Sequence, residues 1–144
     1  GLDLDAGKIA SATASAGDLP ARFAVADLAT APIPPCDTLL LIDVLLQLPH
    51  DAQRALLTRI IAAAPARVVI RNFDSDRGWR SAVGFAMEHV RRRLGGDLGR
   101  HGAVAPLPMR ELAAVLDGAG YRVAVTPCWA GTPLPNVLML AERS

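Results

Sequence analysis

The chain has 144 residues, of which 51% are hydrophobic and 20% are charged, so it can bury a core and is not a disordered protein. Its formal net charge of +1 gives no reason to expect nucleic acid or an anionic membrane as its main partner. Fourteen of its fifteen basic residues are Arg and 26 residues are Ala, a bias that is typical of a GC-rich bacterial genome.

The first third of the sequence alternates strand and helix patterns. Residues Gly1–Leu4 form a short apolar segment that resembles the end of a strand. Asp5 is well placed to cap a helix over 6–16, which is rich in Ala and ends at Gly17. Arg22–Ala26 is a second short strand candidate, and it ends just before an Asp.

A proline-containing loop then leads to a longer strand and helix. Thr38–Ile42 is continuously apolar beyond its first residue, which predicts a strand that is covered on both faces. Residues 51–64 predict a helix that ends at Pro65. Its predicted buried stripe consists of four aliphatic residues, Leu56, Leu57, Ile60 and Ile61.

The next part of the chain again predicts a strand followed by a helix. Arg67–Ile70 predicts a strand, and residues 79–94 predict a long helix that Gly95 and Gly96 break. The apolar residues of this helix recur at helical spacing and include Val83, Met87, Val90 and Leu94.

The last part of the chain predicts a helix followed by two strands. The helix covers 108–117 and begins with proline. The strands at 121–126 and 137–141 have no helix between them, so we expect them to pair antiparallel. The sequence therefore predicts a single α/β domain with a doubly wound, mostly parallel sheet and an antiparallel last strand.

Three of the first four predicted strands end in an acidic residue or just before one, namely Asp3, Asp27 and Asp43. In an open α/β sheet, ligands bind beyond the carboxyl ends of the strands, and an acid there accepts hydrogen bonds from ribose hydroxyls. Asp27 could equally accept from an adenine amine. Each Asp taken alone is also typical of a helix cap or a turn.

At these positions the sequence resembles the class I S-adenosylmethionine-dependent methyltransferases. Gly1–Asp5 resembles the family's second motif, and Val25–Leu28 resembles the motif that follows it. Cys36–Pro49 resembles the fourth motif, while Glu111–Val123 and Asn136–Ala141 resemble the family's late helix and last strands. The resemblance covers almost the whole chain.

The resemblance implies S-adenosylmethionine as cofactor and a small molecule as methyl acceptor. Asp3 would bind the ribose, Asp27 would contact the adenine amine, and the next residue would pack on the adenine ring. The segment around Asp43 would run along the methionine end of the cofactor. The implied cofactor-binding residues are Asp3, Leu4, Asp27, Leu28, Ile42 and Asp43. No catalytic residue is assigned.

The family's first motif, a strand and a glycine-rich turn, is not present in the chain, and we expect it to precede Gly1. The family's strand order is 3-2-1-4-5-7-6, so that strand would lie at the centre of the sheet. Its absence would leave the strand at Thr38–Ile42 with an exposed apolar edge. Such an edge favours pairing with another chain, so a homodimer through this edge is a further expectation.

The remaining polar and aromatic residues have ordinary interpretations. We expect His50 in the first turn of a helix, His89 facing away from the core and His101 in a loop. The spacing of His and Cys residues gives no metal site. The run from Arg91 to Arg93 predicts a solvated helix end. For the two tryptophans, Trp79 and Trp129, a wall of a binding pocket and a core anchor remain equally open.

Compartment and alternative functions follow from features outside these motifs. The sequence lacks both an apolar run of the ~18 residues that span a bilayer and a signal peptide, so we expect a cytoplasmic protein. Cys36 and Cys128 offer at most one disulfide, which a domain of this size does not need. Two other functions stay open, a nicotinamide-dependent oxidoreductase and a non-catalytic interaction or dimerisation module.

Overall fold

The computed structural model describes residues 1–76, 78–93 and 105–143. By its internal contacts the chain divides into two compact units, Gly1–Ile33 and Pro34–Ser144. The single domain expected from the sequence remains a prediction.

The first unit consists of one helix and two very short parallel strands. Strand β1 (Leu2–Asp3) pairs with β2 (Ala24–Val25), and helix α1 (Ala6–Ala16) connects them. Asp5 caps α1 as predicted, because its carboxylate accepts hydrogen bonds from the backbone N–H groups of Gly7 and Lys8. Gly17 ends the helix with a φ of 53°, a conformation that glycine adopts at low cost. No residue of this unit is fully buried.

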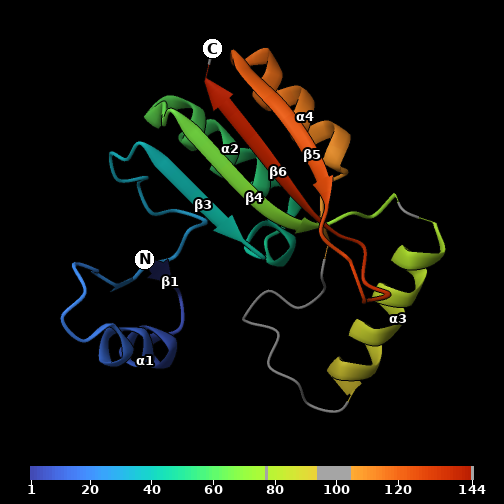
Figure 1. Ribbon diagram of the computed structural model, residues 1–144, viewed down its shortest axis with the longest axis horizontal. Helices are drawn as coiled ribbons and strands as arrows, with labels where there is room; N and C mark the ends of the chain where they lie inside the picture. The colour runs from blue at the N-terminus through green and yellow to red at the C-terminus, as the bar shows by residue number, and fades with distance from the viewer. Residues whose placement is uncertain (77, 94–104, 144) are drawn as a thin grey trace. The chain divides into compact units, whose positions relative to one another are not determined.

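The second unit contains a four-stranded sheet, three helices and a 3₁₀ turn (Figure 1). Its elements follow the predicted order to within a few residues at each end. They are β3 (Thr38–Ile42), η1 (Leu45–Gln47), α2 (His50–Ala63), β4 (Arg67–Phe73), α3 (Trp79–Arg93), α4 (Met109–Gly118), β5 (Tyr121–Pro127) and β6 (Asn136–Arg143).

The strand order of this sheet is β3-β4-β6-β5. Strand β3 is parallel to β4, whereas β6 is antiparallel to both β4 and β5. The predicted antiparallel pairing of the last two strands is therefore confirmed. The order also agrees with the expected 4-5-7-6 part of the family pattern, and the pairing of β1 with β2 agrees with its 3-2 part. The predicted α/β fold with parallel strands and an antiparallel last strand is confirmed.

Helices α2 and α4 pack on one face of this sheet (Figure 1). From α2, Leu56, Leu57 and Ile60 of the predicted stripe are buried, while Ile61 is half-buried. Alternate residues of β4 and β6 point to the same side and complete the core. The fully buried strand residues are Val68, Ile70, Val137, Met139 and Ala141, and α4 adds Leu112 and Leu116 to the same core.

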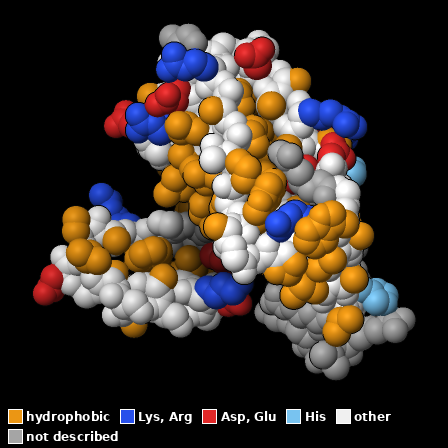
Figure 2. Space-filling model, turned by 45° about the vertical axis from the view of Figure 1, so that its right-hand side comes forward, with side chains coloured by type: hydrophobic (Ala, Val, Ile, Leu, Met, Phe, Trp, Pro, Cys, Tyr) orange, Lys and Arg blue, Asp and Glu red, His pale blue; other side chains and the backbone are white. Residues whose placement is uncertain are grey.

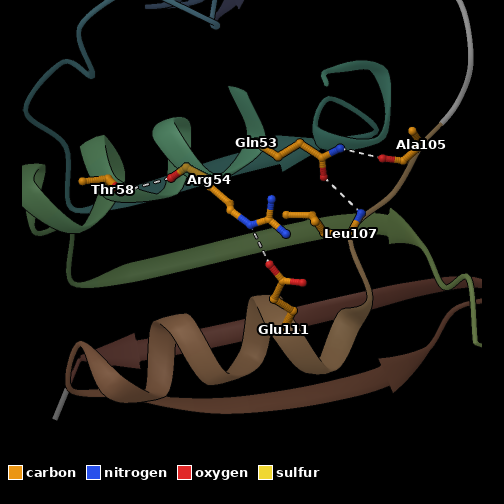
Figure 3. A network of polar contacts seen from close by, with 6 residues as sticks. All are labelled: Gln53, Arg54, Thr58, Ala105, Leu107 and Glu111. Carbon is orange, nitrogen blue, oxygen red and sulfur yellow. Dashed lines mark hydrogen bonds and ion pairs between the residues drawn. The ribbon is translucent and has the colours of Figure 1, made fainter. Parts of the chain in front are cut away.

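A buried glutamine ties α2 to the segment that precedes α4 (Figure 3). Gln53 has no exposed surface, and its amide donates to the carbonyl oxygens of Leu48 and Ala105 at 2.8 and 2.6 Å. Its Oε1 accepts from the N–H of Leu107 at 3.1 Å. All of its strong polar groups are thereby satisfied in the core, where an unpaired amide would be costly.

The prediction that Thr38–Ile42 is covered on both faces is wrong for the residues that the structure describes. Leu40 is 63% exposed and Ile42 is 49% exposed. Both point to the sheet face opposite α2 and α4, together with Leu138 of β6, which is also exposed. Within the described part of the second unit, no helix packs on this face, so its apolar residues remain accessible.

The apolar stripe predicted for the long helix is also not buried as a whole. Met87 and Val90 are exposed, while Leu94 and the break at Gly95 and Gly96 lie outside the described residues. The helix is instead held at its first half. Phe85 packs against Phe73 at the end of β4 with 4.9 Å between ring centroids. A Cβ at Gly84 would lie 2.3 Å from the Phe73 ring, so only glycine allows this approach.

Among the described residues, no helix is both long enough and apolar enough to cross a bilayer.

The predictions for the three histidines differ in outcome. His50 begins α2 and His89 is exposed on α3, as expected, whereas His101 lies outside the described residues. The side chains of Arg91 to Arg93 are likewise outside the description.

Candidate functional site

Two candidate carboxylates of the first unit lie at the carboxyl ends of its two parallel strands. Asp3 is the last residue of β1 and pairs in register with Val25, and Asp27 lies two residues beyond Val25. The N–H of Ala26 donates to the carbonyl oxygen of Asp3 at 2.9 Å and extends the pairing past β2. Because the strands are parallel, Asp3 and Asp27 lie at the same edge of this small sheet.

Each of these carboxylates is oriented by its own following residues. Asp3 Oδ1 accepts a hydrogen bond from the N–H of Asp5 at 2.8 Å, and Asp27 Oδ1 accepts one from the N–H of Ala29 at 2.9 Å. These local turns fix the side chains without a tertiary partner. Among the described residues, the Oδ2 atoms accept no hydrogen bond, so both carboxylates keep an oxygen for a ligand. Leu4 directly follows Asp3 and Leu28 directly follows Asp27, and both leucines are half-buried.

In the second unit, Asp43 follows β3 in a conformation that is uncommon for a residue with a side chain. Its φ is 56°, in the left-handed region. The N–H of Asp43 donates to the carbonyl oxygen of Arg71, and its own carbonyl oxygen accepts from the Gln47 side chain at 2.7 Å. The surrounding contacts therefore maintain a strained backbone, which is a feature found at many functional sites.

Asp43 also forms an ion pair with Arg71 of β4. Burial raises the pKa of Asp43, and the guanidinium of Arg71 partly offsets that rise. The parallel register places Ile42 opposite Arg71, so the ion pair joins the ends of two neighbouring strands. Sequence reasoning missed Arg71, although pairing 38–42 with 67–71 would have placed it beside Asp43.

Further polar groups follow β4 at the same edge of the sheet. Asp74 is buried, and its Oδ1 accepts from the N–H of Asp76 at 3.0 Å. The carboxylate of Asp76 pairs with Arg110 at the start of α4, with 3.2 Å between N and O. A cavity of about 370 Å³ lies between these residues and β5, and it is lined by Asp74, Asp76, Met109, Arg110, Ala113 and Val125.

The structure also brings the two tryptophans together around one arginine. The guanidinium carbon of Arg80 lies 4.8 Å from the ring centroid of Trp79 and 5.2 Å from that of Trp129. Trp79 is 64% exposed, which excludes the role of core anchor that its sequence left open. Sequence reasoning missed Arg80, because its contacts reach almost fifty residues along the chain.

The sequence-predicted residues thus fall into two groups. Asp3, Leu4, Asp27 and Leu28 come together in the first unit, whereas Ile42 and Asp43 belong to the second. Within each unit the residues lie at the carboxyl ends of parallel strands, which is where open α/β sheets bind ligands. Among the described residues, no group of three or more His, Cys, Asp or Glu side chains could hold a metal ion.

The fold is similar to that of several solved structures, among them a methyltransferase. Magnesium protoporphyrin IX methyltransferase (ChlM) from Synechocystis PCC 6803 with bound SAH matches with a TM-score of 0.69 and 18% identity. That match covers all of this chain and 63% of ChlM. The CMeT domain of the citrinin polyketide synthase matches with a TM-score of 0.68 and 18% identity, over 99% of this chain and 38% of its own.

LepI in complex with SAM matches with a TM-score of 0.63 and 18% identity, over 99% of this chain and 35% of LepI. A scan of protein-family models and a search of curated proteins each find no match. The chain therefore spans less than two thirds of these structures and has the fold of class I S-adenosylmethionine-dependent methyltransferases.

Proposed function

We propose that the chain binds S-adenosylmethionine and takes part in methyl transfer to a small-molecule acceptor. The observation that carries this proposal is the strand order β3-β4-β6-β5 with an antiparallel β6, in a fold shared with solved methyltransferases. Two of those structures, ChlM and LepI, hold SAM or SAH. A cytoplasmic setting and a homodimer through the free edge of β3 belong to the same proposal.

The residues of the first unit fit the nucleoside part of this cofactor. Asp3 would accept hydrogen bonds from the ribose hydroxyls and Asp27 one from the adenine amine. Each carboxylate is held by a backbone N–H at one oxygen and keeps the other for a ligand. Leu4 and Leu28 would pack beside the nucleoside, and the segment at Ile42 and Asp43 would line the methionine end.

When bound, S-adenosylmethionine supplies a methyl group on a positively charged sulfur, which a nucleophilic atom of the acceptor takes up by in-line displacement. The protein's part in such a reaction is mainly to hold both reactants in near-attack geometry. The Asp43–Arg71 ion pair would keep the end of β3 in place beside the reacting groups.

Calorimetric titration with S-adenosylmethionine, S-adenosylhomocysteine and NAD⁺ tests the proposal, on residues 1–144 and on the complete gene product. We expect both sulfur compounds to bind and NAD⁺ not to bind. Replacing Asp3 or Asp27 by Asn removes hydrogen bonds to a charged acceptor, which are worth about 1.5–3 kcal/mol. Each variant should therefore weaken binding roughly 10- to 100-fold.

Asp18→Asn is the matched control, because Asp18 is an exposed carboxylate of the same unit that follows no strand. It should leave the affinity unchanged. Binding of NAD⁺ in place of the sulfur compounds would favour the oxidoreductase. Binding of neither class by the complete gene product would favour a non-catalytic module.

One structural neighbour is described as a pericyclic reaction enzyme, with a TM-score of 0.64 and 18% identity. The fold therefore also serves an enzyme that is named for another reaction. A methyl-transfer assay with labelled cofactor separates the two cases once an acceptor is found, since only methyl transfer converts the cofactor to S-adenosylhomocysteine.

A further inference from the structure

Trp79, Arg80 and Trp129 form one cluster, which we call the tryptophan–arginine cluster. The Arg80 guanidinium lies within cation–π distance of both indole rings, at 4.8 and 5.2 Å. Its Nη1 also donates to the carbonyl oxygen of Thr132 at 2.7 Å. The start of α3 and the connection between β5 and β6 are thereby joined through a single side chain.

This cluster lies at the carboxyl ends of the parallel strands of the second unit. Strands β3, β4 and β5 run in the same direction, since β6 is antiparallel to both β4 and β5. Trp79 follows the end of β4 by six residues and Trp129 follows the end of β5 by two. Helix α3, which carries Trp79 and Arg80, extends beyond this end of the sheet (Figure 1).

The cluster is held in place by packing at the first turns of α3. Phe85 packs against Phe73 with tilted rings, and Gly84 permits the close approach of helix and ring. The hydroxyl of Ser81 donates to the carbonyl oxygen of Asp74 at 2.8 Å. Phe73 and Ser81 are buried and Phe85 is partly exposed, so the first turns of α3 that carry Trp79 are held by contacts with the end of β4 and Asp74.

Exposure of Trp79 has no structural explanation in the described residues. A tryptophan gains stability from burial, because its large ring removes much apolar surface from water. Trp79 nevertheless keeps 64% of its surface exposed. Figure 2 shows that hydrophobic side chains also gather elsewhere on the surface of the protein, with Lys and Arg side chains among them. An open aromatic face next to a cation is a surface suited to a planar ligand.

The charge of Arg80 indicates which planar ligand fits. Five other described arginines pair with carboxylates, namely Arg54, Arg67, Arg71, Arg110 and Arg122. Arg80 has no carboxylate partner among the described residues. A guanidinium presents five N–H donors, and among the described residues Arg80 donates to one acceptor, the carbonyl oxygen of Thr132. An anionic oxygen of a ligand would supply the missing partner.

We propose that the tryptophan–arginine cluster binds the methyl acceptor and that this acceptor is a planar aromatic acid. Its ring packs on the exposed indole of Trp79, and its carboxylate or phenolate oxygen accepts from Arg80. Trp129 positions Arg80 from the other side. The inference rests on the proposed function in one respect, namely that the bound aromatic acid is the methyl acceptor. Binding of an aromatic acid at this cluster can be tested without any cofactor.

The test uses the side-chain N–H signals of tryptophan in a ¹⁵N–¹H correlation spectrum. The chain contains two tryptophans and both belong to the cluster, so each signal reports on this site. The probes are naphthoate, cyclohexanecarboxylate, which lacks the aromatic ring, and naphthylmethanol, which lacks the charge. We expect naphthoate to shift both signals saturably, and each of the other probes to bind at least about tenfold more weakly.

Arg80→Gln removes the charge and should weaken naphthoate binding roughly 10- to 100-fold while leaving naphthylmethanol unchanged. Arg122→Gln is the matched control, since Arg122 is exposed near the other end of β5 and should not affect either probe. Arg80→Lys keeps the charge but loses the planar fork, and it serves where Arg80→Gln fails to fold. We expect it to bind naphthoate with intermediate affinity.

Three results would overturn the inference: no saturable shift with naphthoate, equal binding of cyclohexanecarboxylate or naphthylmethanol, or an equal loss in Arg80→Gln and Arg122→Gln. Its failure can be distinguished from that of the proposed function. If S-adenosylmethionine binds and naphthoate does not, only the acceptor class is wrong. If naphthoate binds and the cofactor does not, the aromatic acid site stands and the methyltransferase proposal falls.

Discussion

The first unit contains two strands of two residues each and no fully buried residue, whereas the second contains all of the fully buried side chains among the described residues. The candidate nucleoside ligands Asp3 and Asp27 belong to the first unit and are oriented by local turns. The Asp43–Arg71 pair and the tryptophan–arginine cluster belong to the second and depend on contacts between distant elements.

This difference indicates how the two groups of residues should respond to substitution. Side chains that only local hydrogen bonds orient can be replaced with little effect on the stability of the chain. Side chains that join packed elements contribute to both stability and ligand binding. Three predictions examine the contrast, beginning with the largest expected effect.

Removing a core side chain should destabilise the second unit far more than a similar change in the first. Leu112 has no exposed surface, so Leu112→Ala should lower the free energy of unfolding by about 2–5 kcal/mol. Leu19 of the first unit is 68% exposed, and Leu19→Ala should change it by no more than about 0.5 kcal/mol. Urea unfolding followed by circular dichroism measures both. Equal losses in the two variants would remove the contrast.

A buried polar contact should matter nearly as much as apolar packing in the second unit. Gln53→Ala leaves the N–H of Leu107 and the carbonyl oxygens of Leu48 and Ala105 without this partner. We expect a loss of about 1–3 kcal/mol in the free energy of unfolding, which the same urea titration measures. Gln47→Ala is the control, because Gln47 is exposed and its side chain makes one hydrogen bond among the described residues, to the carbonyl oxygen of Asp43. A similar loss in both would show that burial is unimportant here.

The pKa values of two carboxyl groups, one in each unit, should be shifted in opposite directions. Hydrogen bonds from the backbone N–H groups of Lys8 and Gly7 lower the pKa of Asp5 below its ordinary value of 3.8. Burial raises the pKa of Asp43 above the same value, and Arg71 partly offsets the rise. Carboxyl ¹³C shifts followed against pH measure both values. Arg71→Gln should raise the pKa of Asp43 further.

The two shifts have opposite consequences for stability. The contribution of Asp5 is fully present above pH 3.8 and is lost as the pH falls through its lowered pKa. Asp43 favours the folded state most when it is protonated, and this contribution is lost as the pH rises from 3.8 through its raised pKa. A measured pKa that is lower for Asp43 than for Asp5 would contradict the predicted opposite shifts of these two groups.

Several features of this protein were determined by the sequence alone, because they depend on neighbouring residues. Helix periodicity, the cap at Asp5 and the stop at Gly17 are local properties, and the order of strands and helices follows from them. That order was sufficient to predict the α/β class, the antiparallel last pair and the acids at the strand ends.

Other features were decided only by the tertiary structure, because they depend on residues that are far apart in the chain. The exposure of Leu40 and Ile42 depends on which sheet face α2 and α4 cover, and an apolar run by itself is equally compatible with one or two covered faces. The pairing of Asp43 with Arg71 depends on the register of β3 against β4. The contact of Arg80 with Trp129 depends on where two connections meet beyond the sheet, which no local pattern encodes.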